Sequence, residues 1–134
     1  MKVFIDSNVP MYVAGAEHAN REPAARFLAR VQRRAVDACT STEVLQEILY
    51  RYCALGRRDT ARDVYNLFVE ICPVVLDVTL ADTDRARDLL LTTRGISARD
   101  AVHAGVMLNH KVEWIATFDS GFDAVAGIRR IKLA

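Results

Sequence analysis

Two short apolar runs in this sequence each end at an aspartate. The run 3–5 is followed by Asp6, and the run 114–118 is followed by Asp119. If both runs are central strands of a parallel sheet, their carboxyl ends share one edge, which brings the two carboxylates together. An aspartate after a strand also suits the N-cap of a following helix, which is the structural alternative for either residue. Two aspartates at equivalent strand ends favour a functional site.

Two further acids are candidates for the same site, and each lies near the start of an expected helix. Asp100 lies in the first turn of a helix expected over 98–108, at capping-box spacing from the serine three residues before it. Capping its own helix is compatible with facing the edge where the strands end. In the helix expected over 43–54, Glu43 and Glu47 are both candidates. Glu47 lies closer to the flank of the apolar stripe, so helical geometry favours it over Glu43.

Carboxylates gathered in this way repel one another unless a cation lies between them. Hard divalent cations prefer oxygen ligands, so the set Asp6, Glu47, Asp100 and Asp119 predicts Mg²⁺ or Mn²⁺. The sequence has no Cys-x-x-Cys pair and no histidine pair at ligand spacing, which disfavours Zn²⁺. One ion can activate a water and another can stabilise the departing oxygen of a phosphodiester. We therefore interpret His103, one turn after Asp100, as a structural histidine.

The remaining sequence predicts an α/β fold with a mostly parallel sheet. Strand-like runs begin near residues 3, 36, 74, 114 and 128. Between them lie segments with helical spacing of apolar residues, at 23–34, 43–54, 60–71, 80–93 and 98–108. The segment 41–72 is expected to contain two consecutive helices. Alternating strands and helices are typical of a layered fold in which helices cover a parallel sheet.

Bulk properties indicate one ordinary globular domain over residues 1–134. The chain is 51% apolar and 26% charged, and its net charge is +1, so no strong global field attracts nucleic acid. No run approaches a membrane span, and the N-terminus does not resemble a signal peptide, so we expect a cytoplasmic protein without membrane contact. The three cysteines are expected to be buried apolar groups. Arginines far outnumber lysines, which is compatible with an RNA ligand but also with solvated helix faces.

Four blocks of the sequence resemble the PIN-domain ribonucleases, and most closely the VapC-type toxins of toxin–antitoxin pairs. The blocks are FIDSNV, STEVLQEI, SARDAVHA and ATFDSGFD, and they occur in the family's order over nearly the whole chain. The resemblance implies a three-layer α/β/α sandwich and a metal-dependent endoribonuclease. It matches the four core acidic positions and an additional acid, and it matches small polar positions that support the acids. In order, these residues are Asp6, Glu47, Asp100, Asp119, the additional Asp123, and the supporting Ser7, Asn8 and Thr117.

The same resemblance implies the partners of the protein. The expected substrate is structured cellular RNA, such as a loop of tRNA or rRNA, and the expected regulator is a small antitoxin that wraps the toxin and closes the acidic groove. The toxin itself is expected to be a homodimer. The residues by themselves identify neither partner.

Two other classes of protein are compatible with parts of the pattern. A phosphatase with an aspartyl nucleophile at Asp6 would need a second aspartate two residues on, where the chain has Asn8. A non-catalytic RNA-binding or scaffold domain with the same fold would not need four acids at corresponding positions. It also predicts no thermal stabilisation by Mn²⁺.

Overall fold

The computed structural model describes residues 1–133. Within them the strands are β1 (Lys2–Ile5), β2 (Asp37–Ser41), β3 (Val75–Leu76), β4 (Trp114–Ala116) and β5 (Arg129–Arg130). The helices are α1 (Asn8–Ala14), α2 (Arg21–Gln32), α3 (Thr42–Ala54), α4 (Arg58–Ile71), α5 (Leu80–Thr92), α6 (Ala98–Asn109) and the short 3-10 helix η1 (Ser120–Ala124).

The strands form one parallel sheet in the order β3-β2-β1-β4-β5. The central strand β1 pairs on both sides: Phe4 lies opposite Cys39 of β2 and Ile115 of β4. The chain first steps from β1 through β2 to β3, and then returns to β4 on the other side of β1. This reversal makes the junction of β1 and β4 the topological switch point of the sheet.

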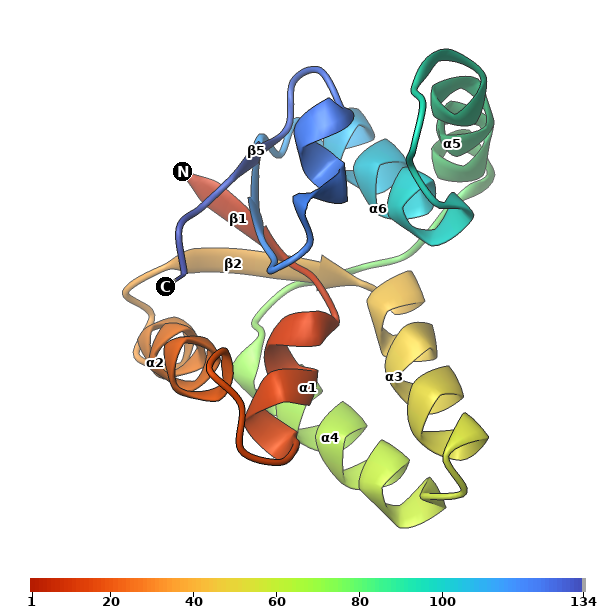
Figure 1. The fold of residues 1–134 in the computed structure, drawn as a ribbon. Helices are drawn as coiled ribbons and strands as arrows, with labels where there is room; N and C mark the ends of the chain where they lie inside the picture. The colour runs from red at the N-terminus through yellow and green to blue at the C-terminus, as the bar shows by residue number, and fades with distance from the viewer. Residues whose placement is uncertain (134) are drawn as a thin grey trace.

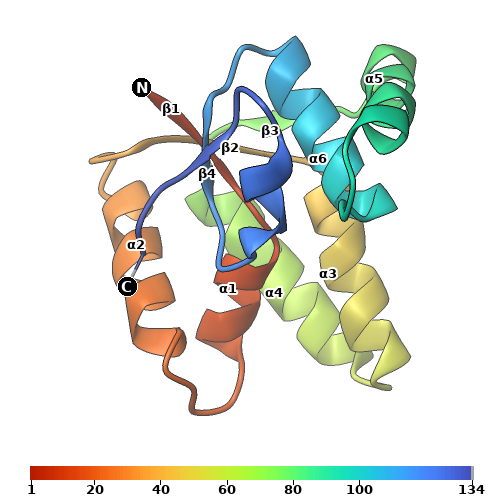
Figure 2. The ribbon, with the colours of Figure 1, turned by 45° about the horizontal axis from the view of Figure 1, so that its top comes forward.

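The order of the strands also sets the helical layers. Parallel crossovers are right-handed, so the two connections before β3 place α1–α4 on one face, and the return to β4 places α5 and α6 on the other. Figure 1 shows this division, with α5 and α6 grouped apart from α1–α4. The turned view in Figure 2 shows the same grouping. The predicted three-layer α/β/α sandwich is confirmed, including consecutive helices α3 and α4 in segment 41–72.

The core lies on both faces of the sheet and is built mainly from the strands and the inner stripes of the helices. Val3, Phe4 and Ile5 of β1 are all fully buried, as expected for the central strand of a parallel sheet covered on both faces. Helix α4 buries every third or fourth residue, including Val64 and Phe68. This packing holds the carboxyl end of β1 rigidly in the middle of the molecule.

Two expectations about individual elements differ from the structure. Helix α1 was not expected, because it is only seven residues long and contains Pro10. Proline is tolerated there since it lies in the first turn, where backbone N–H groups lack helical partners. Strand β4 is shorter than the apolar run, because the chain leaves the sheet after Ala116. Within the described residues, no helix has the length and apolar character needed to cross a membrane.

The expectation that all three cysteines are buried is wrong for one of them. Cys39 and Cys72 are buried, whereas Cys53 is exposed near the end of α3. The helical stripe places Tyr52 inward and turns the next residue to solvent. Burial raises the pKa of the Cys39 thiol to about 12 and that of Cys72 to about 11.

Alkylation of the native protein with iodoacetamide is therefore expected to label Cys53 alone. The other two thiols are shielded from the reagent, and their raised pKa values leave almost no thiolate to react. Peptide mass spectrometry locates the label, and unfolding in denaturant should expose all three cysteines. Native labelling of Cys39 at the rate of Cys53 would contradict the packing of β2.

Candidate active site

Four elements lie close together at the switch point of the sheet: β1, β4, α3 and α6. Asp6 directly follows β1, and its backbone N–H still donates to the carbonyl of Ala116 at the end of β4 (3.1 Å). Helices α3 and α6, which carry Glu47 and Asp100, pack against each other beside this edge. Ligands bind outside the carboxyl ends of the strands at such a crevice in open parallel sheets.

Asp6 is buried and held by hydrogen bonds to both carboxylate oxygens. The backbone N–H of Ser7 donates to Oδ1 (2.7 Å), and the Thr117 hydroxyl donates to Oδ2 (2.8 Å). The Asn8 amide also approaches Oδ2 (3.4 Å). Burial raises the pKa of Asp6, and the neighbouring His103 and these hydrogen bonds offset only part of that rise. The carboxylate is therefore fixed in position while its charge is poorly solvated.

The three small polar residues singled out by sequence connect the ends of β1 and β4. The Asn8 amide donates to the Thr117 hydroxyl oxygen (3.0 Å), which also accepts from the backbone N–H of Asp119 (3.0 Å). The Ser7 hydroxyl donates to Oε2 of Glu47 (3.1 Å). These contacts orient the acids from one side, and their contribution to activity remains a prediction.

Glu47 is the more buried of the two candidate glutamates on α3. It is 7% exposed, its Oε1 contacts His103 Nε2, and the Arg99 guanidinium lies 3.6 Å from its Oε2. Burial acts to raise the pKa of Glu47, but the hydrogen bond and charge of His103, together with Ser7 and Arg99, outweigh burial and lower it. Glu43 lies one turn earlier and is not among the residues that line the cleft described below.

His103 lies beneath the acids and is fully buried. Its Nε2 contacts Glu47 and lies 3.7 Å from Asp6 Oδ1, and one potential ligand atom from each of the three residues lies within 4.8 Å of the others. Burial disfavours the imidazolium, but Glu47, Asp6 and Asp100 together raise the pKa of His103. The spacing of the sequence did not indicate this contact with Glu47 and Asp6, and the expected structural role of His103 remains a prediction.

Asp100 and Asp119 approach the site from the other side. Ser97 caps α6 by accepting from the backbone N–H of Asp100 (3.2 Å), so Asp100 occupies the first turn as expected. Burial, the charge of Asp6 and contact with Asp119 raise the pKa of Asp100 to about 7. Asp119 is exposed, and its Oδ1 accepts from the backbone N–H of Gly121 (2.8 Å).

Gly121 leaves open the space over these two carboxylates. A Cβ at this position would lie 3.1 Å from Asp119 Oδ1 and 3.7 Å from Asp100 Oδ2. The first distance is tighter than an ordinary contact, so a side chain here would press on Asp119. Glycine therefore keeps this approach to the acids clear.

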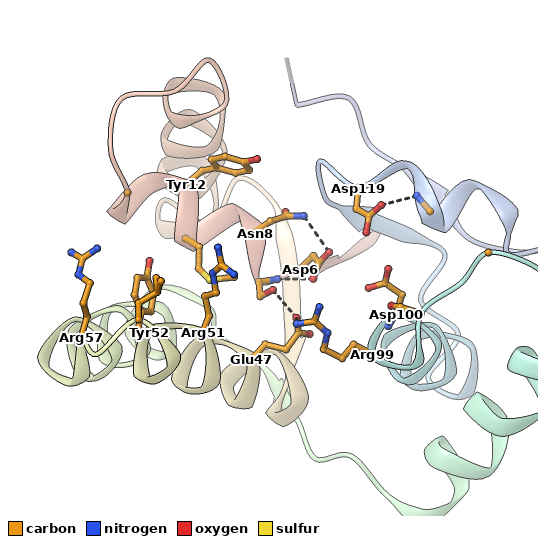
Figure 3. A pocket seen from close by; sticks show the side chains of 17 residues that line it. Asp6, Asn8, Tyr12, Glu47, Arg51, Tyr52, Arg57, Arg99, Asp100 and Asp119 are labelled. Atoms are coloured by element: carbon orange, nitrogen blue, oxygen red, sulfur yellow. Dashed lines mark hydrogen bonds and ion pairs between the residues drawn. The ribbon is translucent and has the colours of Figure 1, made fainter.

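Asp6, Glu47, Asp100 and Asp119, named here the acidic cluster, line one cleft of about 710 Å³. Figure 3 shows these four side chains converging from separate elements. Asp123 does not line the cleft: its carboxylate accepts two hydrogen bonds from Arg130 (2.7 and 2.8 Å). Its expected role as an additional metal ligand remains a prediction.

The acidic cluster fits a hard divalent cation. Its donors are carboxylate oxygens from four elements, and burial raises the pKa of Asp6 and of Asp100, so their charged forms are poorly solvated. The open space beside Gly121 gives access to them. Mg²⁺ and Mn²⁺ suit such oxygen donors and retain several waters. Asp6 and Glu47 offer ligand atoms within 4.8 Å of each other, and Asp100 and Asp119 line the same cleft, so these four residues could hold such an ion.

Without metal, replacing Asp100 with asparagine is expected to raise the Tm by about 3–6 °C at about pH 8. The folded state keeps the Asp100 proton up to about pH 7, whereas the unfolded state loses it near 3.8. The free energy of unfolding therefore falls as pH rises between these values and stays low above them. Because solvent screens the charges at this half-exposed site, the variant should gain only about 1–2 kcal/mol in its free energy of unfolding.

Thermal denaturation in EDTA at several pH values measures this difference. The advantage of the Asp100→Asn variant should shrink as the pH is lowered towards about 4, because the wild-type carboxyl then also becomes neutral. A variant no more stable than wild type at about pH 8 would show that the carboxylates do not repel one another in the folded protein.

The cleft extends beyond the acidic cluster along residues that the sequence did not assign to the site. Met11 and Tyr12 come from α1, Arg51 comes from α3, and Leu55 directly follows α3. A signal was present in the sequence: Arg51 and Leu55 follow Glu47 at intervals of four, so they share its helix face. Finding them required the position of α1, which was not expected.

A model of the PIN domain matches residues 3–128 of the chain. Ribonuclease VapC13 of Mycobacterium tuberculosis is 38% identical over 129 residues, covering 96% of this chain and 98% of the relative. Ribonuclease VapC23 of the same species is 36% identical over 120 residues, covering 87% and 92%.

Solved structures share the fold at lower identity. Mycobacterium tuberculosis VapC20, described as a toxin that cleaves the Sarcin-Ricin loop, superposes with a TM-score of 0.76 at 23% identity, covering 92% of this chain and 95% of that one. VapBC2 from Rickettsia felis, solved bound to a fragment of promoter DNA, gives 0.75 at 13% identity, with 98% of each chain covered.

Proposed function

This chain belongs to the PIN-domain family, among its VapC members, and we propose that it is a divalent-metal-dependent endoribonuclease, the toxin of a type II toxin–antitoxin pair. The two relatives described above are named ribonucleases, and this chain aligns with nearly the full length of each. The proposed substrate is an unpaired loop in structured cellular RNA, such as tRNA or rRNA.

The observation that carries this proposal is the convergence of the acidic cluster. Its four residues are separated by up to 113 positions in the sequence, from Asp6 to Asp119, yet all line one cleft at the switch point of the sheet. A fold does not need four carboxylates there, because their mutual repulsion costs stability. A cation site that supports hydrolysis of a phosphodiester would explain why these carboxylates lie together.

Each side chain of the acidic cluster has a distinct contribution in this mechanism. When bound, Mg²⁺ or Mn²⁺ would lower the pKa of water and offset the negative charge of a phosphodiester. Asp6, fixed by Ser7 and Thr117, presents a preorganised oxygen at the floor of the cleft. Asp100 and Asp119 face it from the opposite wall. Glu47, kept ionised by His103, is placed to accept a proton beside the reacting phosphate.

The depth of the acidic cluster favours unpaired RNA. Asp6 and Glu47 are only 4% and 7% exposed, so a phosphodiester must enter the cleft to approach them. The backbone of a rigid duplex cannot leave its helix to do so, whereas a loop can splay its nucleotides outward. This geometry supports cleavage in loops over cleavage in helical stems.

We also propose an antitoxin partner and a homodimer, both from membership of the family. Two helices carry exposed apolar residues that a partner could cover, including Leu49 and Tyr50 of α3 and Leu90 and Leu91 of α5. Light scattering of the purified chain distinguishes a dimer from a monomer of 15.0 kDa. A monomer at micromolar concentration would contradict the homodimer.

The proposed activity is tested by incubating the purified protein with total bacterial RNA and Mn²⁺, and then mapping the new RNA ends. We expect a small number of cut sites in loops, and no cutting in EDTA. An Asp6→Asn variant purified in parallel controls for contaminating nucleases. Equal cutting in EDTA, or by the variant, would contradict a metal-dependent activity of this chain.

A further inference from the structure

The cleft has a second half whose chemistry differs from that of the acidic cluster. It is walled by α1 and α3, and by the residues just after α3. On α1, Asn8, Met11 and Tyr12 face it at helical spacing, and Gly15 lines it directly after the helix. On and after α3, its lining residues are Glu47, Arg51, Tyr52, Leu55 and Arg57. From Glu47 to Leu55 the helix rises roughly 12 Å, so this half leads well away from the carboxylates.

Two arginines give this half a positive charge. Figure 3 shows Arg57 and Arg51 leading towards Glu47, with Tyr52 between them and Tyr12 across the cleft. Within residues 1–133 neither guanidinium has a carboxylate within 4.0 Å, so both keep their charge available to a ligand. By contrast, Arg99 at the acidic cluster is already paired with Glu47.

Contacts with neighbouring side chains orient the aromatic residues and one arginine of this half. The Arg57 guanidinium lies over the Tyr52 ring, 5.9 Å from its centroid, and Tyr52 itself is only 6% exposed. This contact orients Arg57 at low entropic cost. Tyr12 packs edge-on against Phe118, with ring centroids 5.1 Å apart. Met11 and the exposed Leu55 complete an apolar wall beside the charges.

We infer that this half of the cleft binds the single-stranded RNA that flanks the scissile phosphate, with Arg51 and Arg57 contacting backbone phosphates and the wall of Tyr12, Met11 and Leu55 contacting a base. The inference rests on the proposed function, which places the scissile phosphate at the acidic cluster. Guanidinium groups match phosphate oxygens, and contact with an apolar or aromatic wall accepts any base. The arginines also offset the repulsion between the acidic cluster and an anionic strand.

The test measures binding separately from cleavage. The probe is a short fluorescein-labelled single-stranded RNA of mixed sequence, titrated by fluorescence anisotropy in an Asp6→Asn background, which is not expected to cut it. Arg51→Gln and Arg57→Gln should each weaken binding about three- to tenfold at about 0.1 M salt, and each should reduce the slope of log K against log salt by about 0.7. The double variant should lose about 1.4 from the slope.

Matched controls separate phosphate contact from general charge. Arg58→Gln removes the neighbouring exposed arginine, which does not line the cleft, and should leave the slope unchanged. Arg57→Lys keeps a cation and should retain most of the slope. All variants should keep the Tm of their parent to within about 1 °C, because Arg51 and Arg57 are exposed.

The outcomes distinguish this inference from the proposed function. If the wild-type protein cleaves total RNA but Arg51→Gln and Arg57→Gln leave the salt slope of binding unchanged, the inference is overturned and the proposed function stands. A reduced slope without metal-dependent cleavage by wild type would support the binding surface and overturn the nuclease. Equal losses in Arg58→Gln and Arg57→Gln would also overturn the inference, since the effect would then be one of net charge.

Discussion

Asp100→Asn is expected to lower the rate of metal-dependent RNA cleavage about a thousandfold or more, with the fold intact. Asparagine keeps the shape of the side chain but removes one of the charges that would hold the cation opposite Asp6. Loss of one preorganised electrostatic group at a reacting centre costs about a hundred- to a thousandfold, and weaker cation binding adds to this. Single-turnover cleavage of a mapped RNA loop measures the rate.

The same helix supplies a matched pair of variants that tests the choice of glutamate. Glu47→Gln should impair cleavage strongly, whereas Glu43→Gln should cut at close to the wild-type rate, because Glu43 does not line the cleft. Combining Asp100→Asn with Glu47→Gln should add little to either change alone, since residues that act as a unit are not additive. Wild-type cleavage by Asp100→Asn, or a larger loss in Glu43→Gln, would contradict the assignment.

Mn²⁺ is expected to raise the Tm of the wild-type protein by about 5–10 °C when present at roughly a hundred times its dissociation constant. Binding to the folded state alone stabilises it by about 2.7 kcal/mol at that ratio, and the unfolded chain cannot bring the acidic cluster together. Differential scanning fluorimetry across a Mn²⁺ titration measures the shift.

The difference in Tm between Asp100→Asn and wild type should change sign between EDTA and Mn²⁺. In EDTA the variant is expected to melt above wild type, because repulsion between carboxylates is relieved. With Mn²⁺ it should melt below wild type, because it binds the cation weakly. A variant that merely damages the fold would melt lower in both conditions. An equal Mn²⁺ shift in both proteins would place the stabilising cation elsewhere.

The sequence predicted the architecture because its patterns were local. Apolar runs of strand length, separated by helical stripes, indicated a parallel sheet, and the acids that follow the runs 3–5 and 114–118 indicated its functional edge. Pairing of β1 with β4 then brought Asp6 near Asp119, as expected for adjacent parallel strands. The choice of Glu47 over Glu43 followed from its place on the helix wheel, and the structure brings Glu47 to the cluster.

The features that were missed depend on contacts between distant parts of the chain. His103 has the same local sequence whether or not Glu47 of another helix contacts it, so this contact appears only in three dimensions. Helix α1 is too short for periodicity to reveal, although it forms one wall of the cleft. Asp123 pairs with Arg130, seven residues later, and does not line the cleft, and its expected role as an additional metal ligand remains a prediction.

The central claim is that Asp6, Glu47, Asp100 and Asp119 together form one site for a hard divalent cation. An anomalous difference map from a crystal grown with Mn²⁺ tests it most directly, because it locates the cation itself. We predict a peak in the cleft within coordination distance of Asp6 and Asp100, and no such peak in crystals of the Asp100→Asn variant. A cleft without a peak, at a Mn²⁺ concentration that raises the Tm in solution, would contradict the claim.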